Sequence, residues 1–492
     1  MFTGRSRLPL CVVTVALACA PSETPWHERV VAGGSGVEPT SPGGAGSPAS
    51  GAPSGGVAGS GGGGEAGKTP AAGGSAGSSG DAPSAGQGSG GGLTNDVDPS
   101  TLAFKHLFGY QGWFSCPGDG GANRWVHWFK ANSATAANAT FDLWPDLTEL
   151  DSDELFPTEL TLPQNAGPAR LYSASNPKTV ARHFKWMKDA GIDGVFVQRF
   201  LSDVKDSAAR AVRDQVLKNV RAGAEMHGRV FAVMYDISGA NAATLVGDLE
   251  AEWQHLTIDL RVTESPRYLH HHGRPVLAIW GLGFTDRPGT AADAKRLIDD
   301  LHGGSAPVTL LGGVPTGWRT LNDDSKTDAA WSAVFRAFDV LSPWSVGRYV
   351  NDSGADAFNT QHAVPDLAEL QPLGVEYMPV VFPGFSWHNL HAGPLNQIPR
   401  RGGAFYWRQV YNAVRAGSTM LYGAMFDEVD EGTAFFKVVT NQDVLPVQGT
   451  FLTWDADGTE LPSDWYLRLA GAATRTLRRD LPLTEAIPII PR

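Results

Sequence analysis

The sequence predicts an α/β protein of the (β/α)₈ TIM barrel class, and three observations support this prediction. Eight apolar runs, rich in β-branched and aromatic residues, follow one another along the chain. Helical segments lie between most of them. The runs are almost continuously apolar, as expected for parallel strands that are buried on both faces. They are Leu107–Phe114, Gly194–Phe200, Arg229–Asp236, Pro275–Trp280, Pro307–Val314, Phe338–Trp344, Tyr377–Phe382 and Met420–Phe426.

The helices between the runs carry recognisable ends. The clearest helix is expected at Lys178–Ala190, where Asn176 can cap the first turn and Pro177 suits the first position. Gly191 can end it. Two further helices are expected at Arg210–Met226, ending at Gly228, and at Asp464–Arg478, with Ser463 as a candidate cap.

A doubly wound open sheet is the alternative that strand–helix alternation leaves open. No Gly-rich phosphate loop follows the first run, which weakens that alternative. In a barrel the functional groups gather at the carboxyl ends of the strands. The residues that follow each run are therefore the candidates for a site.

The N-terminus predicts export. Arg5 and Arg7 precede an apolar stretch, Leu8–Ala18, that is too short to span a bilayer. Cys19 follows a small residue, as in a bacterial lipobox, so residues 1–19 are expected to be a lipoprotein signal peptide with lipidation at Cys19. We expect a bacterial outer-membrane or cell-surface lipoprotein whose only membrane contact is this anchor, with a secreted protein as the alternative.

Composition separates a tether from a folded domain. Residues 33–93 are almost entirely Gly, Ser, Ala and Pro, so 20–97 are expected to form a disordered tether and 98–492 the folded (β/α)₈ domain. The net charge of −12 argues against nucleic-acid binding. Two of the three cysteines lie in the export segment and the third is Cys116, so no disulfide framework is expected. We expect a monomer.

The strand ends are rich in aromatic and polar residues. Sugars present apolar faces that stack on aromatic rings and hydroxyls that pair with carboxylates, amides and guanidinium groups. An oligo- or polysaccharide is therefore the expected partner. The candidate substrate-binding residues are Tyr110, Trp113, Trp125, His127, Arg199, Tyr235, Asp236, Trp280, Trp344, Trp387, His388, Asn389 and Asp427.

Four acidic residues crowd together after the eighth run, within Phe426–Thr433. Glu428 and Glu431 are three positions apart, which in a turn brings their Cβ atoms to roughly 5–6 Å. That is close to the roughly 5–5.5 Å between the carboxyl groups of a retaining glycosidase. Two carboxyl groups so close raise one pKa, so that one can act as an acid and the other as a base. The alternative is a solvated acidic loop that caps a following helix.

At this point the sequence resembles the glycoside hydrolase family 99 and family 71-like barrels, most closely an uncharacterised bacterial and fungal branch of this endo-α-mannosidase-like superfamily. The resemblance extends from about residue 107 to residue 437. It is carried by Gly109–Phe114 with Trp125–Trp128, by His183–Lys188 leading to Gly191–Val195, by Pro383–Trp387, and by Glu428–Thr433, which is similar to the motif Glu-Trp-x-Glu-Gly-Thr.

The resemblance implies a retaining α-mannosidase that acts through the 2-hydroxyl group of the sugar and needs no cofactor or metal. Glu428 would be the base and Glu431 the acid. The chain departs from the family at Asp427, where Asn is usual, at Val429 and Asp430, where the family has Trp and His, and after Thr433. Mannan specificity is therefore open. An inverting α-glucanase of the family 71 kind and a non-catalytic glycan-binding surface protein are the alternatives.

Three smaller signals have plainer explanations. His270–His272 precedes Gly273 and is expected to form a surface turn before a strand rather than a metal site. Cys116 with His127 lacks the third group of a nucleophilic triad. Asp427 and Asp430 supply too few ligands for Ca²⁺.

Overall fold

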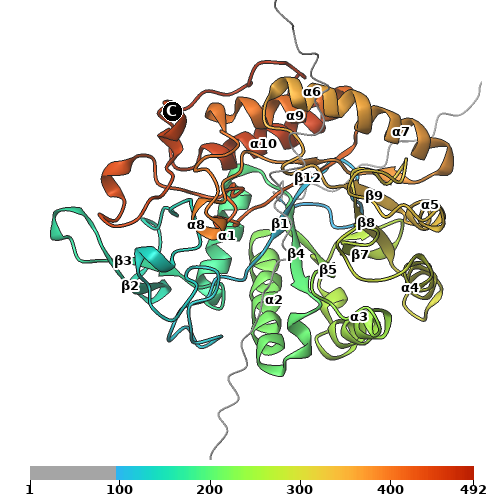
Figure 1. The fold of residues 1–492 in the computed structure, drawn as a ribbon, viewed down its shortest axis with the longest axis horizontal. Helices are drawn as coiled ribbons and strands as arrows, with labels where there is room; N and C mark the ends of the chain where they lie inside the picture. The colour runs from blue at the N-terminus through green and yellow to red at the C-terminus, as the bar shows by residue number, and fades with distance from the viewer. Residues whose placement is uncertain (1–95) are drawn as a thin grey trace, which may run out of the picture. The chain divides into compact units, whose positions relative to one another are not determined.

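The computed structural model describes residues Asp96–Arg492 and shows a closed parallel barrel (Figure 1). The predicted signal peptide, Cys19 and almost all of the predicted tether lie outside the described residues. The barrel strands are β1 (Lys105–Tyr110), β4 (Gly194–Phe200), β5 (Val230–Asp236), β7 (Arg274–Trp280), β8 (Thr309–Val314), β9 (Val340–Pro343), β10 (Glu376–Tyr377) with β11 (Val380–Val381), and β12 (Met420–Gly423).

The seventh strand closes the barrel in two short pieces. β10 pairs with β9 on one side, and β11 pairs with β12 on the other. Met378 and Pro379, which lie between them, continue the pairing: the Met378 N–H donates to the Leu341 carbonyl, and the Tyr422 N–H donates to the Pro379 carbonyl. Because this strand pairs with β9 on one side and with β12 on the other, the sheet closes on itself and the open-sheet alternative is wrong.

Helices surround the strands, as Figure 1 shows for α2, α3, α4, α5, α7 and α9. The longer ones, such as α1, α2, α4 and α9, form because each buries an apolar face. The helix bounds are α1 (Pro177–Ala190), α2 (Ser207–His227), α3 (Leu245–Gln254), α4 (Ala291–Gly303), α5 (Ala330–Phe335), α6 (Asp352–Phe358), α7 (Val364–Leu370), α8 (His388–His391), α9 (Ala404–Arg415) and α10 (Trp465–Leu477). Within the described part of the chain, no helix is both long and apolar enough to cross a membrane.

The ends of α1 are confirmed, whereas the predicted cap of α10 is wrong. The Asn176 side chain accepts the Lys178 N–H, and Gly191 ends α1 with φ 80°. At α10 the cap position belongs to Asp464, and the hydroxyl of Ser463 has no hydrogen-bond partner among the described residues. α2 starts three residues earlier than expected because the carboxylate of Asp206 accepts the N–H groups of the first turn.

The first and last barrel strands are shorter than their apolar runs. β1 ends at Tyr110, and Gly112 then turns with φ 56°, which an extended strand does not allow. β12 ends at Gly423, and Phe426 donates instead to the carbonyl of Gly109. The rings of Tyr110, the last residue of β1, and Phe426, beyond the end of β12, lie 6.0 Å apart, so residues without strand pairing are still buried and apolarity alone did not reveal where pairing stops.

Two long segments at adjacent strand ends build a layer beside the barrel. Residues 111–176 follow β1 and contain the antiparallel pair β2 (Leu155–Thr161) and β3 (Pro168–Tyr172). Residues 424–464 follow β12, and the segments join through the bridge between Leu143 and Leu452 and through the Phe141 and Phe451 rings, 5.1 Å apart. In Figure 1 these segments lie together at the left of the barrel. They bring residues from two distant parts of the sequence to the same strand ends.

Candidate functional site

The acidic stretch forms a tight turn directly after β12. The carbonyl of Glu428 accepts the N–H groups of Thr433 and Ala434, and the Ser386 N–H donates to the carbonyl of Glu431. Gly432 has φ 67°, and a Cβ there would lie 2.7 Å from the Ser386 nitrogen. The turn therefore needs glycine at this position. Glu428 and Glu431 thus lie at a turn and not on an extended strand.

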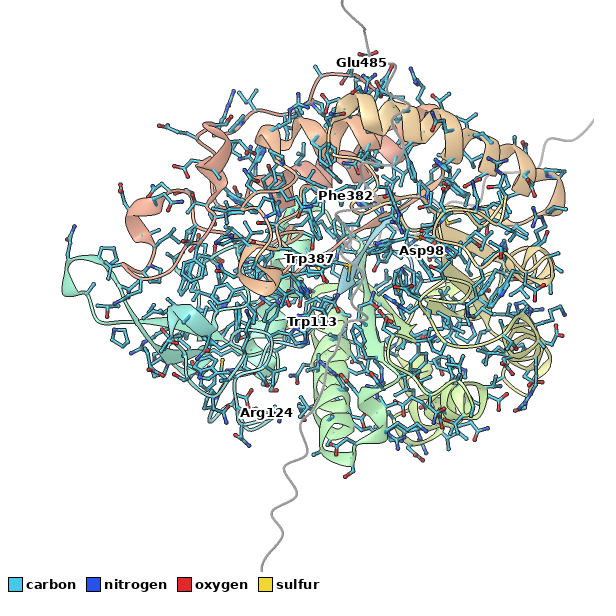
Figure 2. All side chains as sticks on the ribbon, viewed as in Figure 1. Asp98, Trp113, Arg124, Phe382, Trp387 and Glu485 are labelled. Atoms are coloured by element: carbon cyan, nitrogen blue, oxygen red, sulfur yellow. The ribbon has the colours of Figure 1, made fainter. Side chains whose placement is uncertain are left out.

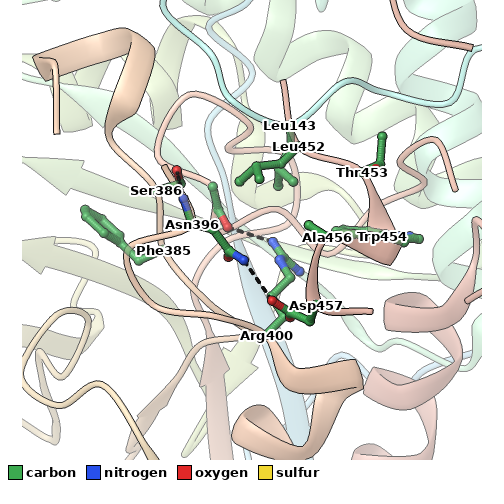
Figure 3. Close-up of a pocket in the computed structure, with 11 residues that line it drawn as sticks. Leu143, Phe385, Ser386, Asn396, Arg400, Leu452, Thr453, Trp454, Ala456 and Asp457 are labelled. Atoms are coloured by element: carbon green, nitrogen blue, oxygen red, sulfur yellow. Dashed lines mark hydrogen bonds between the residues drawn. The ribbon is translucent and has the colours of Figure 1, made fainter. Parts of the chain in front are cut away.

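A buried guanidinium group supports this turn from behind. One Nη atom of Arg400 donates to the carbonyls of Gly432 and Ala434 at 2.7 and 2.8 Å, and the guanidinium lies 4.5 Å from the ring centroid of Trp454. Figure 3 shows Arg400 in a small pocket with Asn396 and Asp457, which are hydrogen-bonded at 2.7 Å. The residues of this pocket support the backbone of the turn through Arg400.

Glu428 is buried and held by two donors. Gln111 Nε2 donates to its Oε1 at 2.5 Å, and the Thr433 hydroxyl donates to its Oε2 at 2.6 Å. Burial raises the pKa of Glu428 to about 8, and the charge of Asp430 adds to the rise, while the two hydrogen bonds oppose it. Glu428 can therefore exchange a proton near neutral pH.

Glu431 is half-buried beside Glu428. Burial, followed by the charges of Glu428 and Asp430, raises the pKa of Glu431 well above its ordinary value. The indole of Trp387 opposes this rise. Glu428 thus affects the ionisation of Glu431, and the raised pKa of Glu431 favours its protonated form, which an acid catalyst needs.

Several predicted residues do meet at this site. Asp236, at the end of β5, contributes to the raised pKa of Glu431, and the Trp387 side chain interacts with Glu431 and lowers that pKa. Trp280 and Trp344, from the ends of β7 and β9, lie edge to face with ring centroids 5.5 Å apart. Figure 2 shows Trp113 and Trp387 near the centre of the barrel in that view. His127 also lies here, bonded to Asp430 at 2.9 Å.

Six other predicted sugar contacts have structural roles, so their assignment is corrected. Tyr110 is fully buried and bonds to His183, and Trp125 packs edge-on against Phe129. Asp427 binds the backbone N–H groups of Gln111 and Gly112, both at 2.8 Å. Arg199 is buried and ion-paired with Asp214 and Glu252, and Tyr235 is fully buried near these charges. The amide of Asn389 donates to the carbonyls of Phe141 and Thr450.

His388 has a mixed role. Its backbone N–H donates to the buried carboxylate of Asp142, and its Nδ1 bonds to the carbonyl of Gly393. Its Nε2 has no hydrogen-bond partner in the described part of the chain. His388 therefore remains a predicted contact.

Sequence reasoning missed the groups that hold the glutamates. Gln111, Thr433 and Asp430 contact the catalytic pair or lie between its members, and Gln198 reaches the interior of the barrel, where it donates to the Tyr422 hydroxyl at 2.9 Å. Neighbouring residues of a strand face opposite sides, so only one of Gln198 and Arg199 can point into the barrel. Which of the two faces inward is not evident in a strand that is buried on both faces.

The histidine triplet is only partly a surface turn. Gly273 turns the chain before β7 as expected, but His271 is buried and pairs with β7 as part of β6 (His270–His271). His271 and His272 both bond to Glu376 through Nε2, which groups three metal-ligand types. The Nδ1 of His271 accepts the Leu102 N–H at 3.1 Å, so in the neutral ring Nε2 carries the proton and offers no lone pair to a metal.

Calcium binding and cysteine nucleophilicity also fit poorly. Both carboxylate oxygens of Asp427 bind backbone N–H groups, and among the described residues neither Asp427 nor Asp430 belongs to a cluster of three metal-ligand side chains. The thiol of Cys116 is buried, donates to the carbonyl of Tyr172, and has a raised pKa because of burial.

Comparison with solved structures identifies a similar barrel. The family 99 endo-α-mannosidase of Bacteroides thetaiotaomicron, alone and in complex with bis-tris-propane, superposes with a TM-score of 0.55 at 14% sequence identity. The match covers 77% of this chain and 99% of that one. The fold is like that of a family 99 glycoside hydrolase. No family model matches the sequence, and no curated protein matches it. The predicted family 99-like barrel is thereby confirmed at the level of the fold.

Proposed function

We propose that this protein is a glycoside hydrolase that cleaves α-linked glycans with Glu428 and Glu431 as its catalytic pair. One observation carries the proposal. Two buried or half-buried carboxyl groups, Glu428 and Glu431, both with raised pKa values, lie beyond the carboxyl end of β12, where barrel enzymes have their active sites. The half-exposed Trp387 beside Glu431 and the Trp280–Trp344 pair supply aromatic surfaces for a sugar.

The roles follow from the surroundings of each carboxyl group. In the first step the Glu428 carboxylate takes the proton of the 2-hydroxyl group, and the oxygen forms a bond to C1 as the glycosidic bond breaks. Glu431 donates its proton to the leaving oxygen. In the second step water attacks C1 and gives a proton to Glu431, while the O2–C1 bond breaks and O2 takes the proton back from Glu428. The donors Gln111 and Thr433 support this proposal, since they stabilise the carboxylate form of Glu428.

The substrate class is proposed as α-mannan, with α-glucan as the second candidate. The family 99 neighbour is an endo-α-mannosidase, which favours mannan. The replacement of the family's Trp-His pair by Val429 and Asp430 changes the sugar contacts and keeps α-glucan open. An inverting enzyme of the family 71 kind would place water between carboxyl groups roughly 6.5–9.5 Å apart.

The test uses the full-length protein on a panel of α-mannans and α-glucans, with the product anomers followed by NMR. We expect cleavage with retention of configuration, and loss of turnover by roughly 100- to 10,000-fold in Glu431→Gln and Glu428→Gln. Glu264→Gln is the matched control, because Glu264 is 62% exposed and lies before β7, at the opposite end of the barrel. Thermal melting checks that each variant is folded.

Two outcomes would overturn parts of the proposal. Full activity of Glu431→Gln would refute the catalytic pair, and products of inverted configuration would favour the family 71 mechanism. Binding of glycans without turnover by the wild-type protein would identify a non-catalytic surface protein instead.

We also propose that the protein is a monomeric exported lipoprotein anchored through Cys19. The lipobox-like Cys19 after Leu8–Ala18 supports this. Incorporation of labelled palmitate in a bacterial host is expected for the wild type and absent in Cys19→Ser. Labelling that is equal in both proteins would refute the anchor. Light scattering of the purified protein tests the monomer.

A further inference from the structure

His127 is held rigidly at the site by its backbone and by a neighbouring ring. It adopts φ 59°, a left-handed conformation that is uncommon for residues other than glycine. Its carbonyl accepts the hydroxyl of Thr140 at 2.5 Å. Its imidazole stacks on Trp113 with ring centroids 3.8 Å apart and planes 2° apart. One face of the Trp113 ring is therefore covered by His127, so this indole supports the imidazole and does not offer that face to a sugar.

A buried carboxyl group fixes the imidazole in its plane. Nδ1 of His127 bonds to Oδ2 of Asp430 at 2.9 Å. The Asp430 side chain is only 1% exposed, and its Oδ1 has no hydrogen-bond partner among the described residues. Burying a carboxyl group with an unsatisfied oxygen is costly. Asp430 lies between Glu428 and Glu431 in the sequence, so a role in positioning His127 at this site would account for the cost.

The other nitrogen of His127 is available. The side chain is 31% exposed, and within residues 96–492 Nε2 has no hydrogen-bond partner. The charged groups that face the imidazole are Asp430, Arg213 and Asp203. Burial and the Arg213 guanidinium lower the pKa of His127, which favours the neutral ring. A neutral ring with its Nδ1 engaged presents one polar atom, Nε2, to a bound molecule.

From this geometry we infer that His127 is a specificity-determining residue whose Nε2 hydrogen-bonds one hydroxyl group of the bound sugar, with Asp430 as the positioning residue behind it. The inference rests on the proposed function, because it places this hydroxyl at the site of Glu428 and Glu431. A sugar hydroxyl can both donate and accept, so it pairs with either tautomer of the imidazole. The pair Asp430–His127 joins the acidic turn to the long segment after β1. The sequence of either segment alone does not reveal this contact.

The test combines one protein substitution with a set of substrates that each lack one hydroxyl group, and compares kcat/KM for every combination. His127→Asn in the full-length protein removes the ring, and Asn tolerates the left-handed backbone. We expect kcat/KM on the glycan that the wild type cleaves to fall roughly 10- to 100-fold, the effect of one hydrogen bond in a reactive site. For one monodeoxy substrate the kcat/KM of the wild type should fall by a similar factor relative to the parent glycan. The kcat/KM of His127→Asn should be the same for this substrate as for the parent glycan. For the other monodeoxy substrates, kcat/KM should fall by the same factor in the wild type and in His127→Asn.

His302→Asn is the matched control, since His302 Nε2 also bonds to an aspartate, Asp339, at 2.9 Å, with 26% of its side chain exposed. It lies at the end of α4, away from the catalytic strand ends, and its kcat/KM should equal that of the wild type. Asp430→Asn gives a second measurement, because an amide oxygen can still accept from Nδ1, and should retain more of the deoxy selectivity than His127→Asn does.

The inference is overturned if every monodeoxy substrate loses the same factor with His127→Asn as with the wild type, because His127 would then act only structurally. It is also overturned if His127→Asn cleaves the parent glycan as fast as the wild type. A wild type that cleaves no glycan of the panel refutes the proposed function and this inference with it, whereas the first two results leave the proposed function intact. If His127→Asn fails to fold, His127→Gln takes its place in the same cycle.

Discussion

Removing one donor from Glu428 should shift the pH dependence of the proposed reaction. Gln111 Nε2 donates to Glu428 Oε1 at 2.5 Å, and Oε1 of Gln111 itself has no hydrogen-bond partner among the described residues. Gln111→Leu keeps a similar volume and the backbone N–H that binds Asp427. The substitution therefore removes a single side-chain interaction, the one that stabilises the charged form of Glu428.

The size and sign of the shift follow from this bond. A hydrogen bond to a charged group contributes about 1.5–3 kcal/mol, and one pKa unit corresponds to roughly 1.4 kcal/mol. The Gln111 bond lowers the pKa of Glu428 against the effect of burial. Its loss should therefore raise the pKa from about 8 by roughly 1–2 units. Because the proposed base must be ionised, the pH at which kcat/KM reaches half its maximum should rise by the same amount.

The measurement is kcat/KM between pH 5.5 and pH 10 on the active glycan. Thr433→Val removes the second donor, 2.6 Å from Glu428 Oε2, and should shift the profile in the same direction. Gln215→Leu removes a bond of α2 between Gln215 and Asn219 and should leave the profile unchanged. An unchanged profile, or one shifted to lower pH, in Gln111→Leu would show that Glu428 is not the base or that this bond does not set its pKa.

Three further predictions concern stability. Asp427→Ala leaves two buried N–H groups without their acceptor and should lower the free energy of unfolding by roughly 2–6 kcal/mol in urea titrations, so a loss below 1 kcal/mol would contradict the role given to this carboxyl group. The pKa values of Asp427 and Glu428 are raised to about 7 and about 8 in the folded chain, so the folded state binds more protons than the unfolded state between pH about 4 and 8. The free energy of unfolding should therefore fall as the pH rises through this range. Melting temperatures should fall over this range in the wild type and less so in Glu428→Gln, and an equal fall in both would refute the assignment. Gly471→Ala would place a Cβ 1.8 Å from the carbonyl oxygen of Ala190, so α10 must move away from α1, and a melting temperature equal to that of the wild type would show that the two helices separate at no cost.

The fold could be predicted largely because its local signals agree with one another. Gly194–Phe200 is a strand with the predicted bounds, and α1 begins and ends at its predicted cap residues. The site was predicted less completely. Asp427 resembled a sugar ligand because it precedes Glu428, yet its oxygens bind backbone N–H groups of a segment more than 300 residues earlier in the chain. No local pattern contains such a partner.

By itself, the sequence determined the eight strands, the cap residues of α1 and the turn that presents Glu428 and Glu431, because strand pairing, capping and turn formation depend on residues close together in the chain. Only the tertiary structure decided the environment of the turn. It placed Gln111 and His127 against the acidic residues, and it placed Arg199 behind the barrel wall. The physical reason is that burial, hydrogen-bond partners and neighbouring charges are set by packing between distant segments. These same factors raise the pKa values of Glu428 and Glu431 and so give the pair its proposed chemistry.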